Sequence, residues 1–208
     1  MSANFYVHIV ESPSASELLN GETEGRALCS FLRIARIPFL YNLAVDKEQF
    51  GIAMKQRIVQ GSRSLQAPPL LHLSAHGSEH GIQLTDQRNE GAYISWAQLS
   101  DYIRPIQQCF GPVGVCMSSC MGVHARRMAE IPWPEKVPIG WIVGTSTPID
   151  LPDAALAFAV FYRRLQKGDT PDLIAAMRAA SAVNDFSIEY GELTQQRYTG
   201  EILAAYDR

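Results

Sequence analysis

The chain has 208 residues, a formal net charge of −3 and 47% hydrophobic residues, which is enough apolar material for one folded domain and excludes a disordered chain. The weakly acidic charge excludes the basic surface of a nucleic-acid-binding protein. No apolar run is long enough to span a bilayer, and residues 1–4 lack the basic start of a signal peptide. We therefore expect a single cytoplasmic domain over residues 1–208, without direct nucleic-acid or membrane contact and with four free cysteine thiols.

The first third of the chain alternates between expected strands and helices. In chain order, the pattern predicts a strand, a helix, a strand, a helix and a loop over residues 5–11, 17–37, 38–45, 47–60 and 60–67. Gly21 and Gly25 weaken the first of these helices. Arg57 and Arg63 make the loop a candidate site of self-cleavage.

The rest of the chain continues the alternation. It predicts strands over 70–75, 113–118 and 139–144, a small hairpin at 82–84 and 93–94, and helices over 95–104, 121–131, 152–165 and 171–183. We expect Pro105 to stop its helix, and Gly168 to cap the helix that begins at Pro152. Thr170 and Pro171 open the last helix.

Strands and helices alternate without an internal repeat or a linker-like segment. This order is typical of α/β proteins in which helices cover both faces of a parallel sheet. We therefore predict a three-layer α/β/α sandwich with a mainly parallel central sheet. In open sheets of this kind, ligands bind beyond the carboxyl ends of the strands.

A histidine and a cysteine follow two of the predicted strands. His76 comes directly after the strand at 70–75, and Cys120 comes two residues after the strand at 113–118. If these strands are parallel neighbours, both side chains emerge at the same edge of the sheet. An imidazole beside a thiol can take its proton and later protonate a leaving amine. The pair therefore predicts nucleophilic catalysis by Cys120, with His76 as the general base.

The surroundings of the pair fit this chemistry. A helix that begins just after Cys120 would direct the positive end of its dipole at the thiol and favour the thiolate. Backbone N–H groups at Gly77 and Cys120 would stabilise the oxyanion that forms during the reaction. Glu79 and Asp86 are candidates to orient His76, although neither stands out as a third member.

Blander interpretations of the same residues remain open. A lone free cysteine is more often a small buried hydrophobe, and a lone histidine is more often a satisfied loop residue. His72, His76 and His80 are spaced four residues apart, but prolines and glycines argue against a helix there. In a strand they lie too far apart to share a zinc ion. We therefore expect no metal and no cofactor.

Two acidic residues follow the last predicted strand. Asp150 or Asp153 would cap the helix that begins at Pro152, which is the interpretation we favour. Alternatively, one of them lines a pocket for a basic side chain of the substrate.

Four motifs occur in order between Phe5 and Ala180. They are residues 71–77 (LHLSAHG), residues 117–122 (MSSCMG), residues 143–145 (VGT), and Asp153 with Phe158, Phe161, Tyr162 and Gly168. Together they resemble the caspase-like cysteine peptidases, and among them the bacterial CHAT branch. The resemblance implies a caspase-haemoglobinase fold, a catalytic histidine at His76, a nucleophile at Cys120 and an oxyanion glycine at Gly77. The aromatic residues of the last motif would then be structural.

The chain also departs from the caspase pattern. Ser-Ser-Cys-Met-Gly stands where caspases have Gln-Ala-Cys-x-Gly, so a preference for cleavage after aspartate is not expected. Besides a protein or peptide substrate, the resemblance implies a separate sensor or regulatory protein as partner. By analogy, such a protease acts in bacterial defence or cell death. A non-catalytic binding or adaptor module and a small-molecule amide hydrolase with the same pair are the alternatives.

Overall fold

The computed structural model of the chain describes residues 4–85, 92–132, 134–169, 172–181 and 183–206. The strands are β1 (Tyr6–Ser12), β2 (Phe39–Leu43), β3 (Pro69–Ser78), β4 (Gly81–Gln83), β5 (Tyr93–Ser95), β6 (Val113–Ser118), β7 (Ile139–Gly144) and β8 (Ser187–Tyr190). The helices are α1 (Ala15–Asn20), α2 (Glu24–Ala35), α3 (Lys47–Ile52), the π-helix η1 (Ala53–Arg57), α4 (Ile58–Leu65), α5 (Trp96–Phe110), the 3₁₀ helix η3 (Gly122–Ala129), α6 (Leu151–Lys167), α7 (Leu173–Ala180) and α8 (Gly191–Tyr206).

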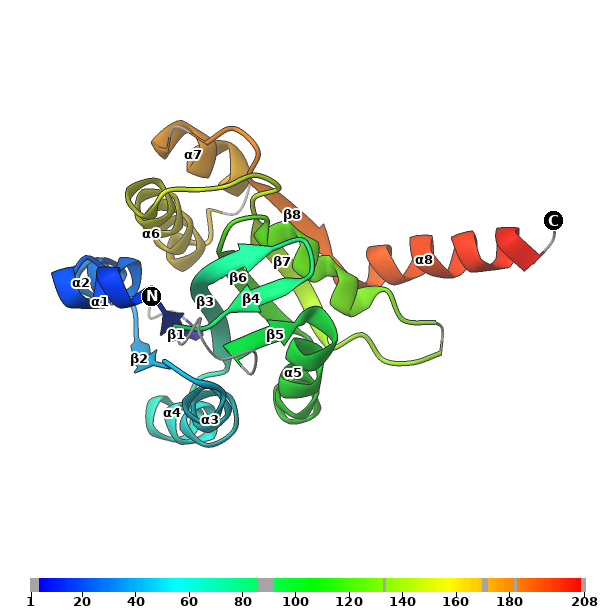
Figure 1. Cartoon of the computed structure of the whole chain (residues 1–208), viewed down its shortest axis with the longest axis horizontal. Helices are drawn as coiled ribbons and strands as arrows, with labels where there is room; N and C mark the ends of the chain where they lie inside the picture. Colours follow the sequence, from blue (N-terminus) through cyan, green and yellow to red (C-terminus); the bar gives the residue numbers. More distant parts are fainter. Residues whose placement is uncertain (1–3, 86–91, 133, 170–171, 182, 207–208) are drawn as a thin grey trace.

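The described strands form one mainly parallel sheet. Its order is β2-β1-β3-β6-β7-β8, and β4 and β5 extend from the end of β3 as a small hairpin (Figure 1). The pairs from β2 through to β7 are parallel, and β8 is antiparallel to β7. Every residue of β1 and β6 is buried, as expected for strands that are covered on both faces. The predicted parallel sheet and the predicted hairpin are confirmed.

Helices cover both faces of the sheet and enclose two apolar cores. On one face α3, η1, α4, α5 and η3 contribute Phe50, Met54, Ile58, Leu99 and Met128. On the other face α2, α6 and α7 contribute Leu28, Leu32, Phe158, Phe161 and Met177. Figure 1 shows the two groups of helices on opposite sides of the strands. The chain is therefore an α/β protein with a three-layer arrangement.

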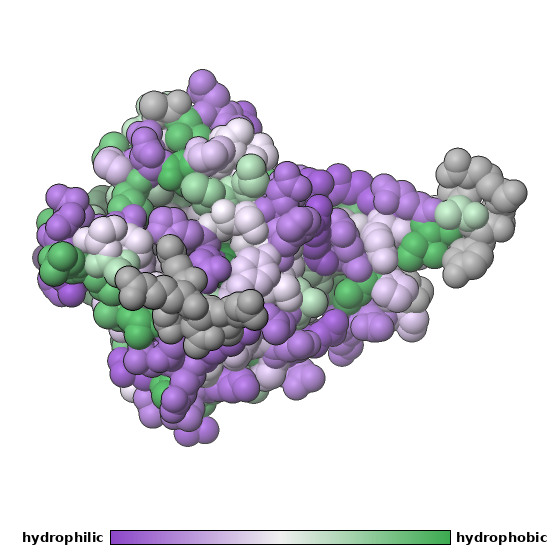
Figure 2. Space-filling view, in the orientation of Figure 1, coloured by the Kyte–Doolittle hydropathy of each residue, from purple (hydrophilic) through white to green (hydrophobic). Residues whose placement is uncertain are grey.

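Helix α8 projects from the edge of the sheet and points away from the body (Figure 1). Among the residues of α8 whose burial is described, the buried ones are Gly191, Thr194 and Gln195, in the first turns. Figure 2 shows mostly hydrophilic side chains on this face of the molecule. Within the described parts of the chain, none of the helices combines the length and the apolar character needed to cross a membrane.

The helix predicted over 17–37 is two helices. Gly21 has a φ of 71°, in the left-handed region that glycine adopts without strain, and its N–H donates to the carbonyls of Glu17 and Leu18. This capping arrangement ends α1, and α2 begins three residues later. The expected weak point at Gly21 is thus a helix end.

Pro105 does not stop its helix, and that prediction is wrong. It lies inside α5, which continues to Phe110. Proline has no N–H to donate, so the carbonyl of Asp101 loses its helical partner. Both Asp101 and Pro105 are exposed, and water can bond this carbonyl instead. The proline therefore costs the helix less than it would on a buried face.

The prediction of a loop over 60–67 is also wrong as far as Leu65, because α4 extends to that residue. Gly61 allows this by close packing, since a Cβ there would lie 2.8 Å from the Tyr6 hydroxyl. Arg63 is therefore in a helix, which is a poor substrate for proteases, and the candidate self-cleavage site loses its basis. The helix opening predicted at Thr170 and Pro171 lies outside the described residues.

We expect His8 to make the fold sensitive to acid. The ring is fully buried, with Nε2 3.1 Å from the carbonyl oxygen of Ala53, and burial lowers its pKa to about 4. The unfolded chain, with an ordinary histidine pKa of about 6.5, binds a proton between these values that the native state does not. Stability is therefore present above pH 6.5 and is lost as the pH falls toward 4.

The expected loss due to His8 is about 2 kcal/mol in the free energy of unfolding between pH 7 and pH 5. Urea denaturation of wild type and of His8→Gln at both pH values measures it. The variant should lose about 2 kcal/mol less than wild type over this range. Equal losses in the two proteins would show that His8 titrates normally in the native state.

Candidate active site

A cleft of about 220 Å³ lies at the carboxyl edge of the sheet. Its walls come from the ends of β1, β3 and β6 and from the start of α6. The lining residues are Glu11, Ser12, Pro13, Glu17, Ser74, Ala75, His76, Ser118, Ser119, Cys120, Ile149, Asp150, Leu151 and Ala154. The structure thus places His76 and Cys120, which the sequence paired, in the same cleft.

The pairing of β3 with β6 explains this placement. The register aligns Ser74 with Ser118, so His76 and Cys120 each follow two residues after an aligned pair. The segments that follow these aligned residues are still in close contact, because a Cβ on Gly77 would collide with the carbonyl oxygen of Cys120. Because β3 and β6 are parallel and in register, the histidine and the cysteine both lie at the carboxyl edge of the sheet.

The chain makes a tight turn at Cys120. Met121 has a φ of 56°, a left-handed conformation that costs a non-glycine residue on the order of 1–3 kcal/mol. The N–H of Met121 donates to the carbonyl of Thr147 (3.2 Å), and the N–H of Val123 donates to that of Thr145 (3.0 Å). These bonds join the loop after β6 to the loop after β7. Cys120 itself is half-buried.

The helix predicted over 121–131 differs from the expectation. It is the 3₁₀ helix η3, and the N–H groups of Met121, Gly122 and Val123 at its start are engaged by carbonyls of Thr147, Ser119 and Thr145. The dipole of a well-formed α-helix is therefore not directed at Cys120, and that source of thiolate stabilisation is lost. Of the two sources of activation expected from the sequence, His76 is the one that remains.

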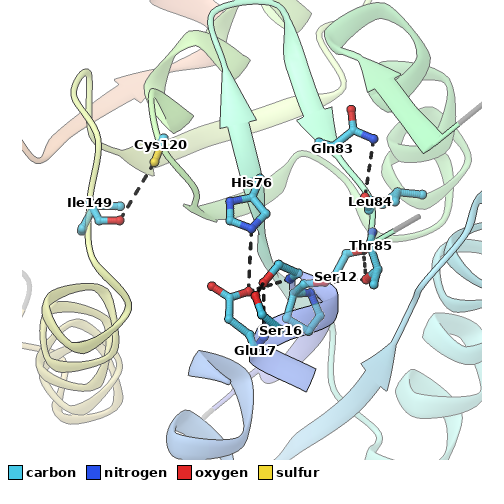
Figure 3. Close-up of polar contacts among 11 residues, drawn as sticks. Ser12, Ser16, Glu17, His76, Gln83, Leu84, Thr85, Cys120 and Ile149 are labelled. Atoms are coloured by element: carbon cyan, nitrogen blue, oxygen red, sulfur yellow. Dashed lines mark hydrogen bonds and ion pairs between the residues drawn. The ribbon is translucent and has the colours of Figure 1, made fainter. Parts of the chain in front are cut away.

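Figure 3 shows Cys120 and His76 turned to different partners. The Sγ of Cys120 lies 4.0 Å from the carbonyl oxygen of Ile149. The Nε2 of His76 lies 3.7 Å from Oε2 of Glu17, and the His76 side chain is 46% exposed. Since an exposed ring can rotate, and catalytic hydrogen bonds often tighten only when substrate binds, this arrangement is compatible with a catalytic pair.

The contact of Glu17 with His76 was not predicted from the sequence. Glu79, one expected partner of His76, is not among the described lining residues of the cleft, and its backbone carbonyl oxygen accepts hydrogen bonds from Trp96 Nε1 and Arg127 Nη1, both at 2.8 Å. Asp86, the other, lies outside the described residues. The available signal was a capping-box pattern from Ser14 to Glu17 directly after the first strand, but its relevance depends on β1 lying beside β3.

The other histidines of the evenly spaced trio lie elsewhere. His72 is buried on the sheet, with Nε2 3.2 Å from Oε1 of Glu24. His80 is on the hairpin, with Nδ1 3.1 Å from Nη1 of Arg127. His76 alone of the three lines the cleft. The three rings therefore have separate partners and do not converge on one ion.

The environments of the four cysteines differ. Burial raises the pKa of the Cys116 thiol far above its ordinary value and that of Cys29 to about 11. Both thiols therefore stay protonated at neutral pH and are poor nucleophiles. Cys109 is exposed in the last turn of α5. Of the four, Cys120 is the one in the cleft.

The predicted substrate-binding acids separate in the structure. Asp150 lines the cleft and occupies the N-cap position of α6, where its carbonyl accepts from Ala154 but its side chain makes no capping hydrogen bond. Asp153 lies in the first turn of α6 and is not among the described lining residues. Capping by an aspartate side chain, the interpretation favoured from sequence, is therefore not found at Asp150.

Glu11 forms part of the cleft floor. Its side chain is fully buried, with Oε1 accepting from the N–H of Gly25 (2.6 Å) and Oε2 accepting from the Tyr41 hydroxyl (2.7 Å). Burial raises the pKa of this carboxyl group. Glu11 is thus anchored by the scaffold, whereas Glu17 and Asp150 lie nearer the mouth of the cleft.

Gly77 lies beside the cleft but is not among its described lining residues. We expect Gly77→Ala to lower the free energy of unfolding by about 1–3 kcal/mol and to slow the reaction of Cys120 with an alkylating reagent. The added methyl would meet the Cys120 carbonyl and lie 2.9 Å from Ser119 Oγ. Urea denaturation and mass spectrometry measure the two effects.

Gly200→Ala is the matched control for Gly77→Ala. A Cβ at Gly200 meets nothing within 4 Å, and alanine favours the α8 helix. Gly200→Ala should therefore leave the rate at which Cys120 reacts with the alkylating reagent unchanged. Wild-type stability and reactivity in Gly77→Ala would contradict the close approach of the two strand ends.

Comparison of the chain with protein-family models and with curated proteins gave no match. The resemblance to caspase-like peptidases therefore remains an expectation from the motifs. The chemistry of the cleft carries the functional argument.

Proposed function

We propose that this protein is a cysteine endopeptidase of the caspase-like type, with Cys120 as the nucleophile and His76 as the general base. The observation that carries the proposal is that both residues line one cleft at the carboxyl ends of two adjacent parallel strands. Ligand sites of open α/β sheets lie at this edge. The separation of the other three cysteines from the cleft supports the choice of nucleophile.

The proposed reaction has two stages. His76 takes the thiol proton as Sγ of Cys120 attacks the peptide carbonyl carbon, and the resulting imidazolium gives that proton to the leaving amine. The acyl group is then held as a thioester, which a water molecule hydrolyses with His76 again acting as base. Backbone N–H groups at Gly77 and Cys120 are the proposed donors to the oxyanion. No step requires a metal or a cofactor.

The cleft favours a basic side chain next to the cleaved bond. Glu17 and Asp150 line it, and none of its described lining residues is a lysine or an arginine. A cationic side chain would gain charge-assisted hydrogen bonds from these carboxylates, whereas an acidic one would be repelled. We therefore propose cleavage after lysine or arginine, controlled in the cell by a separate regulatory protein.

Profiling with a peptide library tests this function. We expect cuts after Arg and Lys, and we expect Asp150→Asn to lower kcat/KM for such peptides about tenfold, which is the effect of one charge-assisted hydrogen bond. Asp153→Asn, in the same turn of α6, is the control and should have a smaller effect. Cleavage after acidic residues, or equal effects of both variants, would contradict the proposed specificity.

A non-catalytic binding module is the second candidate, because Cys120 and His76 are turned to different partners in the structure. In that case the same cleft binds a peptide without cutting it. Binding of library peptides without products, at any concentration of protein, would favour this function over the peptidase.

A further inference from the structure

We propose that Glu17 is a positioning residue, which holds His76 by Nε2 and leaves Nδ1 as the nitrogen that takes the proton of Cys120. This inference rests on the proposed function and adds a third member to its catalytic pair. It also assigns the two ring nitrogens, which the pair alone leaves open.

The contact is the starting observation. Oε2 of Glu17 lies 3.7 Å from Nε2 of His76, and the Glu17 side chain is only 22% exposed. Figure 3 shows the His76 ring directed at the Glu17 carboxylate, and both residues line the cleft. A carboxylate accepts hydrogen bonds and does not donate them, so it stabilises the proton on Nε2.

The carboxylate of Glu17 is held in place from its own helix. Its Oε2 accepts from the N–H of Ser14 (2.6 Å), and its N–H donates to Oγ of Ser14 (3.2 Å). This reciprocal capping box begins α1. Two hydrogen bonds also fix the segment between β1 and α1. Ser12 Oγ donates to the carbonyl of Ala44 (2.6 Å), and Thr85 Oγ1 donates to the carbonyl of Pro13 (2.6 Å).

This fixed carboxylate decides the tautomer of His76. With the proton held on Nε2 toward Glu17, the neutral ring has its lone pair on Nδ1. The S–H bond of Cys120 then breaks with transfer of its proton to Nδ1, which gives a thiolate and an imidazolium. The Nε2–H stays on the ring and faces Glu17, whose negative charge stabilises the imidazolium.

Glu17→Gln separates this role from helix capping. Glutamine serves in a capping box as well as glutamate does, with its carbonyl oxygen accepting from Ser14 N–H. Because Ser14 N–H and His76 Nε2 meet the same oxygen, Oε2, the carbonyl oxygen of glutamine also faces Nε2 and leaves the ring proton there. What the substitution removes is the negative charge that stabilises the imidazolium, so the ring takes the proton of the thiol less readily. Ser14→Ala is the control, because it weakens the cap and keeps the carboxylate.

Two measurements on the full chain test the proposal. Nitrogen-15 NMR of labelled histidine gives the tautomer of neutral His76, and mass spectrometry gives the rate at which a peptidyl electrophile labels Cys120. We expect the Nε2–H tautomer in wild type, Ser14→Ala and Glu17→Gln, and the Nδ1–H tautomer in wild type would overturn the inference. Labelling should slow about tenfold in Glu17→Gln and less than twofold in Ser14→Ala.

The outcomes distinguish this inference from the function on which it rests. If His76→Ala slows labelling while Glu17→Gln keeps the wild-type rate, the Glu17 carboxylate does not assist His76 and the proposed pair stands. Equal slowing in Glu17→Gln and Ser14→Ala would assign the effect to the helix cap and overturn the inference. If His76→Ala labels as fast as wild type, the catalytic pair itself fails.

Discussion

Replacing Cys120 by alanine is expected to abolish peptide cleavage and to leave the fold intact. The variant removes the attacking Sγ, and the loss of a covalent nucleophile typically lowers kcat by a factor of about 10³ or more. The side chain is half-buried, and its Sγ lies 4.0 Å from the carbonyl oxygen of Ile149, so little packing is lost. Cleavage assays and thermal melting measure the two halves of this prediction.

Cys109→Ala is the control for the loss of a thiol. Cys109 is exposed at the end of α5, outside the cleft, and its removal should leave cleavage unchanged. Retained cleavage by a well-folded Cys120→Ala protein would remove Cys120 from the mechanism. Loss of cleavage in both variants would indicate a general effect of thiol removal.

Replacing Glu24 by alanine is expected to lower the free energy of unfolding by about 3 kcal/mol. The two carboxylate oxygens lie 3.2 and 3.4 Å from Nε2 of His72, and both side chains are fully buried. The other nitrogen of His72 is 2.8 Å from the hydroxyl of Tyr162. Without Glu24, Nε2 loses its acceptor in a place that water does not reach, and a cavity remains.

Glu22→Ala is the matched control, because Glu22 is exposed two residues earlier in the chain. Its effect on the free energy of unfolding should stay within about 0.5 kcal/mol. Urea denaturation of the two variants measures the difference. Similar stabilities for Glu22→Ala and Glu24→Ala would mean that the buried contact with His72 contributes little.

The centre of the sheet could be predicted from sequence because strands such as β1 and β6 are buried on both faces. Runs such as 70–75 and 113–118 are mostly apolar, and few other structures accommodate such runs bounded by turns. Helix ends were less predictable, because they depend on exposure and packing. Pro105 is accommodated on an exposed face of α5. Helix α4 continues through Gly61, where the lack of a side chain lets the Tyr6 ring of β1 pack against the helix.

The candidate site was predictable in part for the same reason. His76 and Cys120 could be placed because each follows a strand, and the carboxyl ends of parallel strands share an edge. Glu17 could not be placed, because its contact depends on the order β1-β3 and on a capping box that fixes its side chain. The 3₁₀ helix after Cys120 also depends on bonds to the loop at 145–147.

The most direct test of the account is the rate at which a peptidyl electrophile labels each cysteine of wild type and of His76→Ala. Mass spectrometry assigns each adduct to Cys29, Cys109, Cys116 or Cys120. The account predicts fast labelling at Cys120 in wild type, and slower labelling there by on the order of 10² when His76 is lost. Slow labelling of Cys120 at the rate of Cys109, unchanged in His76→Ala, would contradict an activated nucleophile in this cleft.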